Sequence, residues 1–384
     1  MRLAVPKEIV PGERRVALVP EVIPQLLKMG HTVTVEAGAG SRAGFTDDAY
    51  AAAGAMIARD APSTYSGAEM VLKVLRPVDD GDGSEIGNIG SGTVLIGVFQ
   101  PAGSPEFFQH AAQRGLTTLS MELVPRTTRA QMMDVLSSQS TVAGYKAVLL
   151  AANSLQKFFP MLMTAAGTVR PAKVLVIGAG VAGLQAIATA RRIGAVVEAF
   201  DTRPVVKEQV QSLGATFIEL DVDTRDAEDS GGYAKELAEE HIRREKELIH
   251  ERARLADVVI TTALIPGKRA PLLVTAETVE AMKPGSVIVD LAGEQGGNCE
   301  LTEPGKTVEK HGVTIIAPLH ISSELAYHSS QMYAKNLAAL IALLTKDGQL
   351  NLDMNDDIIS AVTVTANGEI RNQAVQTRLA GAAS

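Results

Sequence analysis

A glycine-rich segment, Gly178-Ala-Gly180-Val-Ala-Gly183, follows the apolar run 174–177 and precedes an amphipathic run over 184–193. This G-x-G-x-x-G pattern between a strand and a helix is typical of dinucleotide sites, because its glycines permit a tight turn and close approach of the backbone to a pyrophosphate. The N–H groups at the start of the helix attract the phosphates. The segment predicts a dinucleotide site; a turn that serves packing alone is the alternative.

The next strand ends at Asp201, close to the expected distance of about 20 residues beyond the last glycine. A carboxylate there accepts hydrogen bonds from both ribose hydroxyls and repels the 2′-phosphate of NADP. We therefore expect NAD(H) rather than NADP(H). Arg203 weighs against this preference, because an arginine at this place can accept a 2′-phosphate.

A dense polar stretch over 126–140 could orient the carboxamide of a nicotinamide ring. In a helix, Gln131, Asp134 and Ser138 would share one face. They would then lie where one domain passes into the next, a frequent position for ligand clefts. An ordinary polar helix start is the alternative.

Other kinds of site find little support. The seven histidines form no catalytic or metal-binding pattern, and the single cysteine, Cys299, excludes a disulfide framework and any multi-cysteine metal site. We expect no bound metal. The net charge is −8 and no Lys/Arg-rich run occurs, which disfavours nucleic acid as a partner. No signal-peptide core and no long apolar span are present, so we expect a soluble, cytoplasmic protein.

Apolar runs alternate with helical patterns along the chain, which predicts parallel βαβ units. The expected strands are 2–5, 31–37, 70–75, 94–99, 116–121, 174–177, 196–201, 216–220, 258–262, 287–291 and 313–318. The fold class expected is α/β, with two Rossmann-like domains joined by long helices over 129–158 and 323–344 and a nucleotide cleft between them. We assign 1–128 plus 346–384 to the first domain and 129–345 to the NAD(H)-binding domain. Asn367-Gly368 indicates a hairpin in the tail.

The segment 221–256 does not follow this alternation of strands and helices, since it is rich in charges of both signs and its first part lacks apolar periodicity. One interpretation is a solvated loop followed by an exposed helix. The other is a mobile loop near 221–240 that closes over the ligand.

Taken together, several motifs resemble the family of alanine dehydrogenases and transhydrogenase α subunits. They are Pro6-Lys-Glu with Pro11-Gly-Glu-Arg-Arg15, Lys73-Val74, the Gly178 fingerprint, Thr262-Ala-Leu-Ile-Pro-Gly-Lys268 and Lys283-Pro-Gly-Ser-Val-Ile-Val-Asp290. Further runs resemble the transhydrogenase branch, among them Met121-Glu-Leu-Val-Pro-Arg126, Met163-Thr-Ala-Ala-Gly-Thr168, Gly231-Gly-Tyr233 and Gly296-Gly-Asn-Cys299.

Two departures separate this chain from the alanine dehydrogenase branch. Arg15 and Lys73 match that branch's substrate-binding arginine and lysine, and Glu294 matches its catalytic aspartate, but its catalytic histidine falls near Val98 here. Without an imidazole that titrates near neutral pH, amino-acid oxidation lacks its proton shuttle. The charged insertion is the second departure, and it resembles the mobile loop of the transhydrogenase NAD-binding component.

The resemblance implies the NAD(H)-binding component of a proton-translocating NAD(P) transhydrogenase of the Si-Re (AB-specific) type. Hydride would pass directly from NADH bound here to NADP⁺ on a partner subunit, with proton transfer coupled by a small membrane-spanning subunit. It also implies a homodimer, activity only with the partners, and a peripheral position on the cytoplasmic face of the inner (plasma) membrane.

The resemblance also implies roles for individual residues. Arg126 and Gln131 would hold the carboxamide, Asp134 and Ser137 would support that site, and Tyr233 would close the loop over the nucleotide. The full cofactor-binding set expected is Arg126, Thr127, Thr128, Arg129, Gln131, Gly178, Gly180, Val181, Gly183, Asp201, Thr202, Arg203, Gly232 and Leu264.

Two other functions stay open at this point. One is an alanine dehydrogenase-like amino-acid oxidoreductase, and the other is an NADH-binding module without catalysis. Alanine-dependent NADH production would identify the first, and hydride exchange restored by an NADP-binding component would exclude the second.

Overall fold

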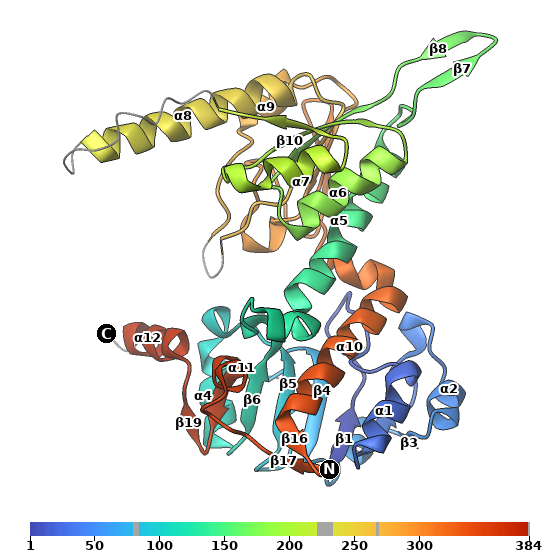
Figure 1. The fold of residues 1–384 in the computed structure, drawn as a ribbon, viewed down its shortest axis with the longest axis vertical. Coiled ribbons are helices and arrows are strands. Elements are labelled where there is room, and N and C mark those ends of the chain that lie inside the picture. Colours follow the sequence, from blue (N-terminus) through green and yellow to red (C-terminus); the bar gives the residue numbers. More distant parts are fainter. Residues whose placement is uncertain (80–83, 221–232, 266–268, 383–384) are drawn as a thin grey trace. The chain divides into compact units, whose positions relative to one another are not determined.

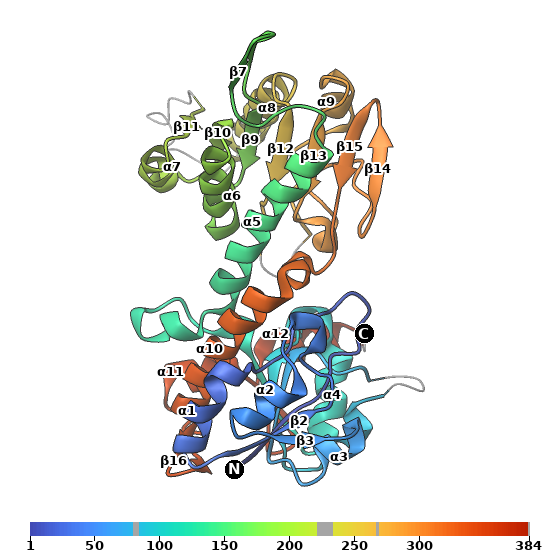
Figure 2. The same ribbon diagram turned by 90° about the vertical axis from the view of Figure 1, so that its right-hand side faces the viewer.

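The structure is a computed structural model and describes residues 1–79, 84–220, 233–265 and 269–382, with residues 233–241 described by their backbone only. The chain divides into two compact units. Unit 1 comprises Met1–Gln139 and Ser322–Ser384, and unit 2 comprises Ser140–Ile321. Figures 1 and 2 show the elements of each unit in two views.

Within the described residues, unit 1 contains an eight-stranded sheet of order β19-β18-β6-β5-β4-β1-β2-β3. Its strands are β1 (Arg2–Val5), β2 (Thr32–Glu36), β3 (Met56–Ala58), β4 (Met70–Leu75), β5 (Val94–Val98), β6 (Thr117–Ser120), β18 (Thr363–Ala366) and β19 (Glu369–Ile370). β1 to β6 pair in parallel, while β18 runs antiparallel to β6 and to β19. The tail therefore lies in unit 1, and the hairpin predicted at Asn367-Gly368 is confirmed.

Helices cover both faces of this sheet, which is why its central strands consist mainly of buried apolar residues. They are α1 (Ile23–Lys28), α2 (Asp47–Ala52), α3 (Ala61–Tyr65), α4 (Pro105–Gln113), α10 (Ala326–Leu344), α11 (Asp357–Val362) and α12 (Gln373–Ala382). Successive strand residues point to opposite faces. Leu72 of β4 accordingly belongs to the cluster with α1 and α10, and Val71 to the cluster with α4.

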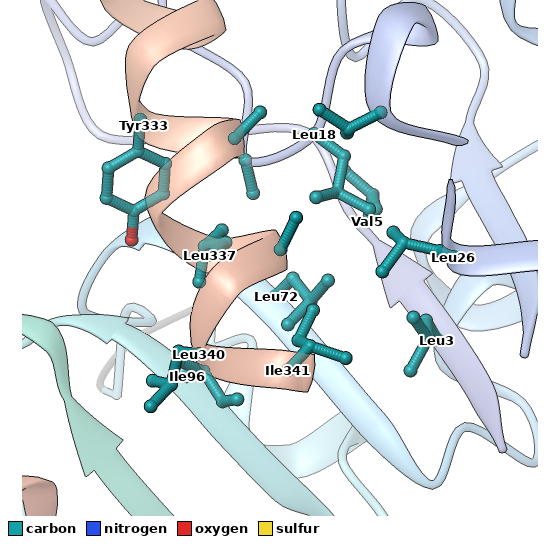
Figure 3. Packing of buried hydrophobic residues seen from close by; sticks show 14 of the residues in the cluster. Leu3, Val5, Leu18, Leu26, Leu72, Ile96, Tyr333, Leu337, Leu340 and Ile341 are labelled. Atoms are coloured by element: carbon teal, nitrogen blue, oxygen red, sulfur yellow. The ribbon is translucent and has the colours of Figure 1, made fainter. Parts of the chain in front are cut away.

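Helix α10 forms part of the core of unit 1. Its side chains Tyr333, Leu337 and Ile341 are fully buried among residues of β1, β4 and α1 (Figure 3). The boundaries of the units therefore fall at 139/140 and 321/322, whereas the sequence leads us to expect 128/129 and 345/346. For the second boundary the physical reason is that α10 buries its apolar face against the first sheet rather than acting as a free connection.

Unit 2 contains, among its described residues, a seven-stranded sheet of order β11-β10-β9-β12-β13-β15-β14. Its strands are β9 (Lys173–Ile177), β10 (Val196–Phe200), β11 (Thr216–Ile218), β12 (Val258–Thr261), β13 (Val287–Asp290), β14 (Thr307–Lys310) and β15 (Val313–Ile316). All neighbours pair in parallel except the edge strand β14. The direction of winding reverses between β9 and β12, and such a switch point is where open α/β sheets bind ligands.

Helices also cover both faces of the second sheet. They are α5 (Val135–Ser154), α6 (Val181–Arg192) and α7 (Lys207–Ser212) on one face, and α8 (Tyr233–Ala253) and α9 (Ala276–Ala281) on the other. In the described ranges, two small hairpins lie outside the large sheets, β7 (Leu162–Thr164) with β8 (Gly167–Val169), and β16 (Thr345–Lys346) with β17 (Gln349–Leu350). The predicted fold class, two α/β units with parallel-rich sheets, is confirmed.

The long helix expected over 129–158 is interrupted. Residues Thr128–Met133 form a short 3-10 helix, η7, and α5 begins only at Val135. The break follows from Asp134, whose carboxylate accepts hydrogen bonds from the backbone N–H of Ser137 at 2.9 Å and from its hydroxyl at 2.6 Å. An aspartate in this arrangement satisfies a free N–H group of a helix start, so it begins a new helix.

Candidate functional site

The glycine-rich fingerprint lies between β9 and α6, as the sequence predicts. Gly178 has φ +97°, and a side chain there would meet the Thr262 hydroxyl at 2.6 Å. A Cβ on Gly183 would lie 1.8 Å from the carbonyl oxygen of Gly178, so only glycine lets α6 pack this closely against the loop. These two glycines are required by the fold itself.

Gly180 differs from its neighbours. Its backbone has φ −76° and ψ −167°, which any residue can adopt, and a Cβ built there meets nothing within 4 Å. Neither conformation nor packing within the described protein therefore requires glycine at this position. The open space in front of the N-terminus of α6 is the space that a pyrophosphate needs.

Asp201 follows the end of β10 and already has partners. Its Oδ2 accepts a hydrogen bond from the backbone N–H of Ala179 at 2.7 Å, and both oxygens accept from the Arg203 guanidinium at 2.9 Å. Burial acts to raise the pKa of Asp201, but these hydrogen bonds from Arg203 and Ala179 outweigh it and lower the pKa. Asp201 is therefore an anion, and it neutralises the arginine that could otherwise attract a 2′-phosphate.

The loop after β12 is tied to the fingerprint. The hydroxyl of Thr262 donates a hydrogen bond to the carbonyl oxygen of Gly178 at 3.0 Å, across the switch point between β9 and β12. Leu264, two residues further on, is 50% exposed. Val181, the first residue of α6, is 42% exposed, and Thr202 next to Asp201 is exposed as well.

The polar stretch over 126–139 belongs to unit 1, whereas the fingerprint belongs to unit 2. Arg126, Thr127, Thr128 and Gln131 are exposed. Asp134 and Ser137 bond to one another at the start of α5, as described above. The expectation that Gln131, Asp134 and Ser138 share one helical face is wrong, because the helix begins after Asp134.

Arg129, another residue of the expected cofactor-binding set, has acidic partners within unit 1. Its guanidinium forms ion pairs with Asp356, at 2.6 Å, and with Asp357, at the start of α11 in unit 1. The hydrogen bond from Arg129 lowers the pKa of Asp356 to about 2. This pairing joins residues more than 200 positions apart, so no local signal could have revealed it.

Part of the expected site lies outside the described residues. This holds for Gly232 and for most of the loop predicted near 221–240. Helix α8 begins at Tyr233, whose side chain is likewise not described.

Arg15 and Lys73, which match substrate-binding residues of alanine dehydrogenases, are buried in unit 1 and paired with carboxylates. Arg15 bonds to both oxygens of Glu13, at 2.8 and 2.6 Å. Lys73 is 0% exposed and lies 2.5 Å from Glu85 and 3.4 Å from Glu8. Burial acts to lower the pKa of Lys73, but the two carboxylates outweigh it and raise the pKa, so the ammonium stays charged.

The remaining residue matched to that branch, Glu294, is held at the surface of unit 2. Its Oε1 accepts a hydrogen bond from the backbone N–H of His320 at 2.7 Å. Across the described ranges no group of three or more His, Cys, Asp and Glu side chains is placed to hold a metal ion. No helix in those ranges is both long enough and apolar enough to cross a membrane.

The fold and this site define a two-unit α/β protein with one dinucleotide-binding unit of the Rossmann type. The family described as "Alanine dehydrogenase/PNT, N-terminal domain" matches residues 4–143, and "Alanine dehydrogenase/PNT, C-terminal domain" matches residues 147–373. The chain therefore belongs to the alanine dehydrogenase/PNT family.

Among the individual relatives, the chain is more similar in sequence to the transhydrogenase branch than to the alanine dehydrogenase branch. The chain is 49% identical to the first part of NAD(P) transhydrogenase subunit alpha of Rhodospirillum rubrum, over 98% of this chain and 99% of that one. A solved structure of transhydrogenase from Sinorhizobium meliloti matches with a TM-score of 0.86 and 45% identity, over 96% of this chain and 100% of the other. Alanine dehydrogenase of Bacillus subtilis is more distant, at 34% identity over 98% of this chain and 94% of its own.

Proposed function

We propose that this chain is the NAD(H)-binding component of a proton-translocating NAD(P) transhydrogenase of the AB-specific type. The observation that carries the proposal is the near full-length similarity to a chain named as the first part of a transhydrogenase alpha subunit. The fingerprint supports it, because Gly180 leaves open the space that a pyrophosphate would fill.

The residues of unit 2 would select NAD(H) and hold its adenosine end. The N–H groups at the start of α6 would bind the pyrophosphate. The Asp201 carboxylate would accept hydrogen bonds from the ribose hydroxyls, and its pair with Arg203 engages the cation that could otherwise bind a 2′-phosphate. NADP(H) would then be bound by a partner subunit and not here.

At the other end, Arg126 and Gln131 would hold the carboxamide, and the Asp134–Ser137 pair would keep η7 and α5 in place behind them. Tyr233 would close over the nucleotide. When bound, NADH supplies the hydride; the protein needs no acid or base for a direct transfer, which accords with Val98 at the place of the alanine dehydrogenase histidine. Gln131→Ala should slow hydride transfer far more than it weakens NADH binding, and an unchanged single-turnover rate would refute this role.

Amino-acid oxidation is the less well supported activity. A 2-oxo acid needs a cation for its carboxylate, and both candidate cations, Arg15 and Lys73, already pair with buried glutamates. The isolated chain should therefore produce no NADH from L-alanine and NAD⁺.

The partners proposed are an NADP-binding subunit and a small membrane-spanning subunit, consistent with the relative's name, which makes that chain one portion of an alpha subunit. The chain would then sit peripherally on the cytoplasmic face of the plasma membrane. We also propose a homodimer. The β7–β8 hairpin supports it, because its apolar side chains are open to solvent, with Met163 80% and Met161, just before it, 58% exposed.

Reconstitution tests the proposal. Adding an NADP-binding transhydrogenase component, with NADP(H), should produce hydride exchange between NADH and an acetylpyridine analogue of NAD⁺. The same mixture without the component should give none. NADH binding without exchange in the complete mixture would instead favour a non-catalytic nucleotide-binding module.

A further inference from the structure

A buried polar network lies beneath the loops at the carboxyl ends of β12 and β13. Its centre is Asp290, the last residue of β13, which is 0% exposed. The carboxylate accepts hydrogen bonds from three backbone N–H groups and two hydroxyls. The donors are the N–H groups of Ala292, Asn298 and Cys299, at 2.9–3.0 Å, and the hydroxyls of Thr261 and Thr302, at 2.7–2.8 Å. Asp290 thereby fixes the course of the loop that follows its own strand.

Asn298 connects that loop to the one after β12. It is 0% exposed, and its Oδ1 accepts a hydrogen bond from the backbone N–H of Ala263 at 3.0 Å. Its Nδ2 donates to the carbonyl oxygens of Ala263, at 2.9 Å, and of Pro271, at 2.8 Å. One amide side chain therefore pairs with both polar groups of the Ala263 backbone. A carboxylate could not do this, because it has no N–H to donate.

Ala263 lies in the loop after β12, next to the glycine-rich fingerprint. The preceding residue, Thr262, bonds to the fingerprint at Gly178, and the two residues that follow, Leu264 and Ile265, are 50% and 46% exposed. In the strand order, β9 lies between β12 and β10, and β10 is the strand that leads to Asp201. A dinucleotide whose adenosine ribose bonds to Asp201 and whose pyrophosphate lies at Gly180 must extend its nicotinamide half toward β12.

We propose that Asn298 is a positioning residue for hydride transfer: by holding the Ala263 backbone, it sets the path of residues 263–265 alongside the nicotinamide half of the bound dinucleotide. The inference rests on the proposed function and adds to it a residue that touches neither substrate. Hydride transfer is sensitive to such placement, since a displacement of about 1 Å can slow a reaction by about 100-fold. The proposed pyrophosphate contacts follow β9 itself, and the ribose contact at Asp201 follows β10, on the far side of β9 from Ala263. Affinity should therefore depend on Asn298 much less than rate.

The test uses Asn298→Ala and Asn298→Asp in the full chain, with Asp257→Asn as the matched control. Asp257 is also a buried, hydrogen-bonded residue of this sheet, but it precedes β12 at the opposite edge, where it pairs with Lys157 and bonds to the backbone of Lys173. The readouts are the Kd for NADH by fluorescence titration and the rate of hydride exchange in the reconstituted mixture. Both Asn298 variants should lose about tenfold or more in exchange rate with a change in Kd below about threefold, while Asp257→Asn should keep both values.

Each of the other possible outcomes would refute a different claim. Wild-type chain that binds no NADH would refute the proposed function. Asn298 variants with the wild-type rate, or with rate and affinity reduced in equal proportion, would refute the positioning role alone. Hydrogen exchange on the wild-type chain decides the matter even if the variants do not fold: NADH should slow amide exchange at 263–265, and equal exchange with and without NADH would refute the inference.

Discussion

The substitution Gly180→Ala tests whether this glycine is required for the stability of the fold or only for ligand binding. In the protein alone, the added methyl group meets nothing within 4 Å and the backbone angles suit alanine. Replacing glycine reduces the entropy of the unfolded chain, which stabilises by about 0.4–1 kcal/mol. Alanine is a poorer residue than glycine just before a helix, by about the same amount. The two terms oppose one another, so the free energy of unfolding should change by less than about 0.5 kcal/mol.

Binding should respond differently, because the methyl group fills the space in front of α6. Loss of one hydrogen bond from the backbone to a charged phosphate costs about 1.5–3 kcal/mol. The Kd for NADH should therefore rise by about 10- to 100-fold.

The assay pairs urea unfolding with a fluorescence titration of NADH. Gly87→Ala is the matched control, since a Cβ there also meets nothing within 4 Å and no ligand is expected beside it. It should leave the affinity for NADH unchanged and raise the free energy of unfolding by about 0.4–1 kcal/mol. Gly180→Ala protein with wild-type affinity for NADH would refute the assignment of this space to the pyrophosphate.

Three further substitutions probe charges. Asp201→Asn should raise the affinity for NADPH relative to NADH by freeing Arg203, as measured by titration. Because the pKa of Asp201 is lowered from 3.8, its stabilising effect is present above about pH 4 and lost as the pH falls further. The variant should therefore lack that loss in urea unfolding measured from about pH 2 to 6. Burial raises the pKa of Glu122 from 4.5 to about 7, so its ionisation favours the unfolded chain as the pH rises across that range. Glu122→Gln should therefore remove a decline in stability of up to about 3 kcal/mol between about pH 4.5 and 8, and an unchanged pH profile would contradict this. Lys73→Met should lower the free energy of unfolding by about 3–5 kcal/mol, because it leaves two buried glutamates without their cation; a loss below about 1 kcal/mol would show that the ion pairs contribute little.

The central strands of both sheets could be predicted from sequence because both of their faces are covered. Strands such as Met70–Leu75 and Val287–Asp290 are apolar except for one charged residue each, Lys73 and Asp290, and such nearly continuous apolar runs are typical of buried parallel strands. The edge strands β3 and β14 were missed. Met56–Ala58 is only three residues long, and Thr307–Lys310 contains one apolar residue and two charged ones, so neither has the pattern of a buried strand.

Local signals also located the fingerprint and Asp201, because strand, turn and helix follow one another directly in the chain. They could not give the partners of Arg129, which come from the start of α11. They also could not reveal Asn298, since the sequence around it contains no ligand pattern. The only local feature at Asn298 is that it follows two glycines. Its proposed positioning role depends on its hydrogen bonds to Ala263, in a loop more than 30 residues before it in the chain.

The interleaving of the two units bears on how the chain folds as it is synthesised. Unit 2 is one uninterrupted segment, but unit 1 is completed only by residues 322–384. The first sheet therefore emerges without α10, which fills its core, and without β18, which covers the edge of β6. At about 5–20 residues per second, the synthesis of residues 140–321 delays that completion by about 10–40 s. During this interval the apolar face of β1, β4 and β5 has no helix α10 to cover it, so we expect the nascent first unit to need protection from aggregation while the second unit can already fold.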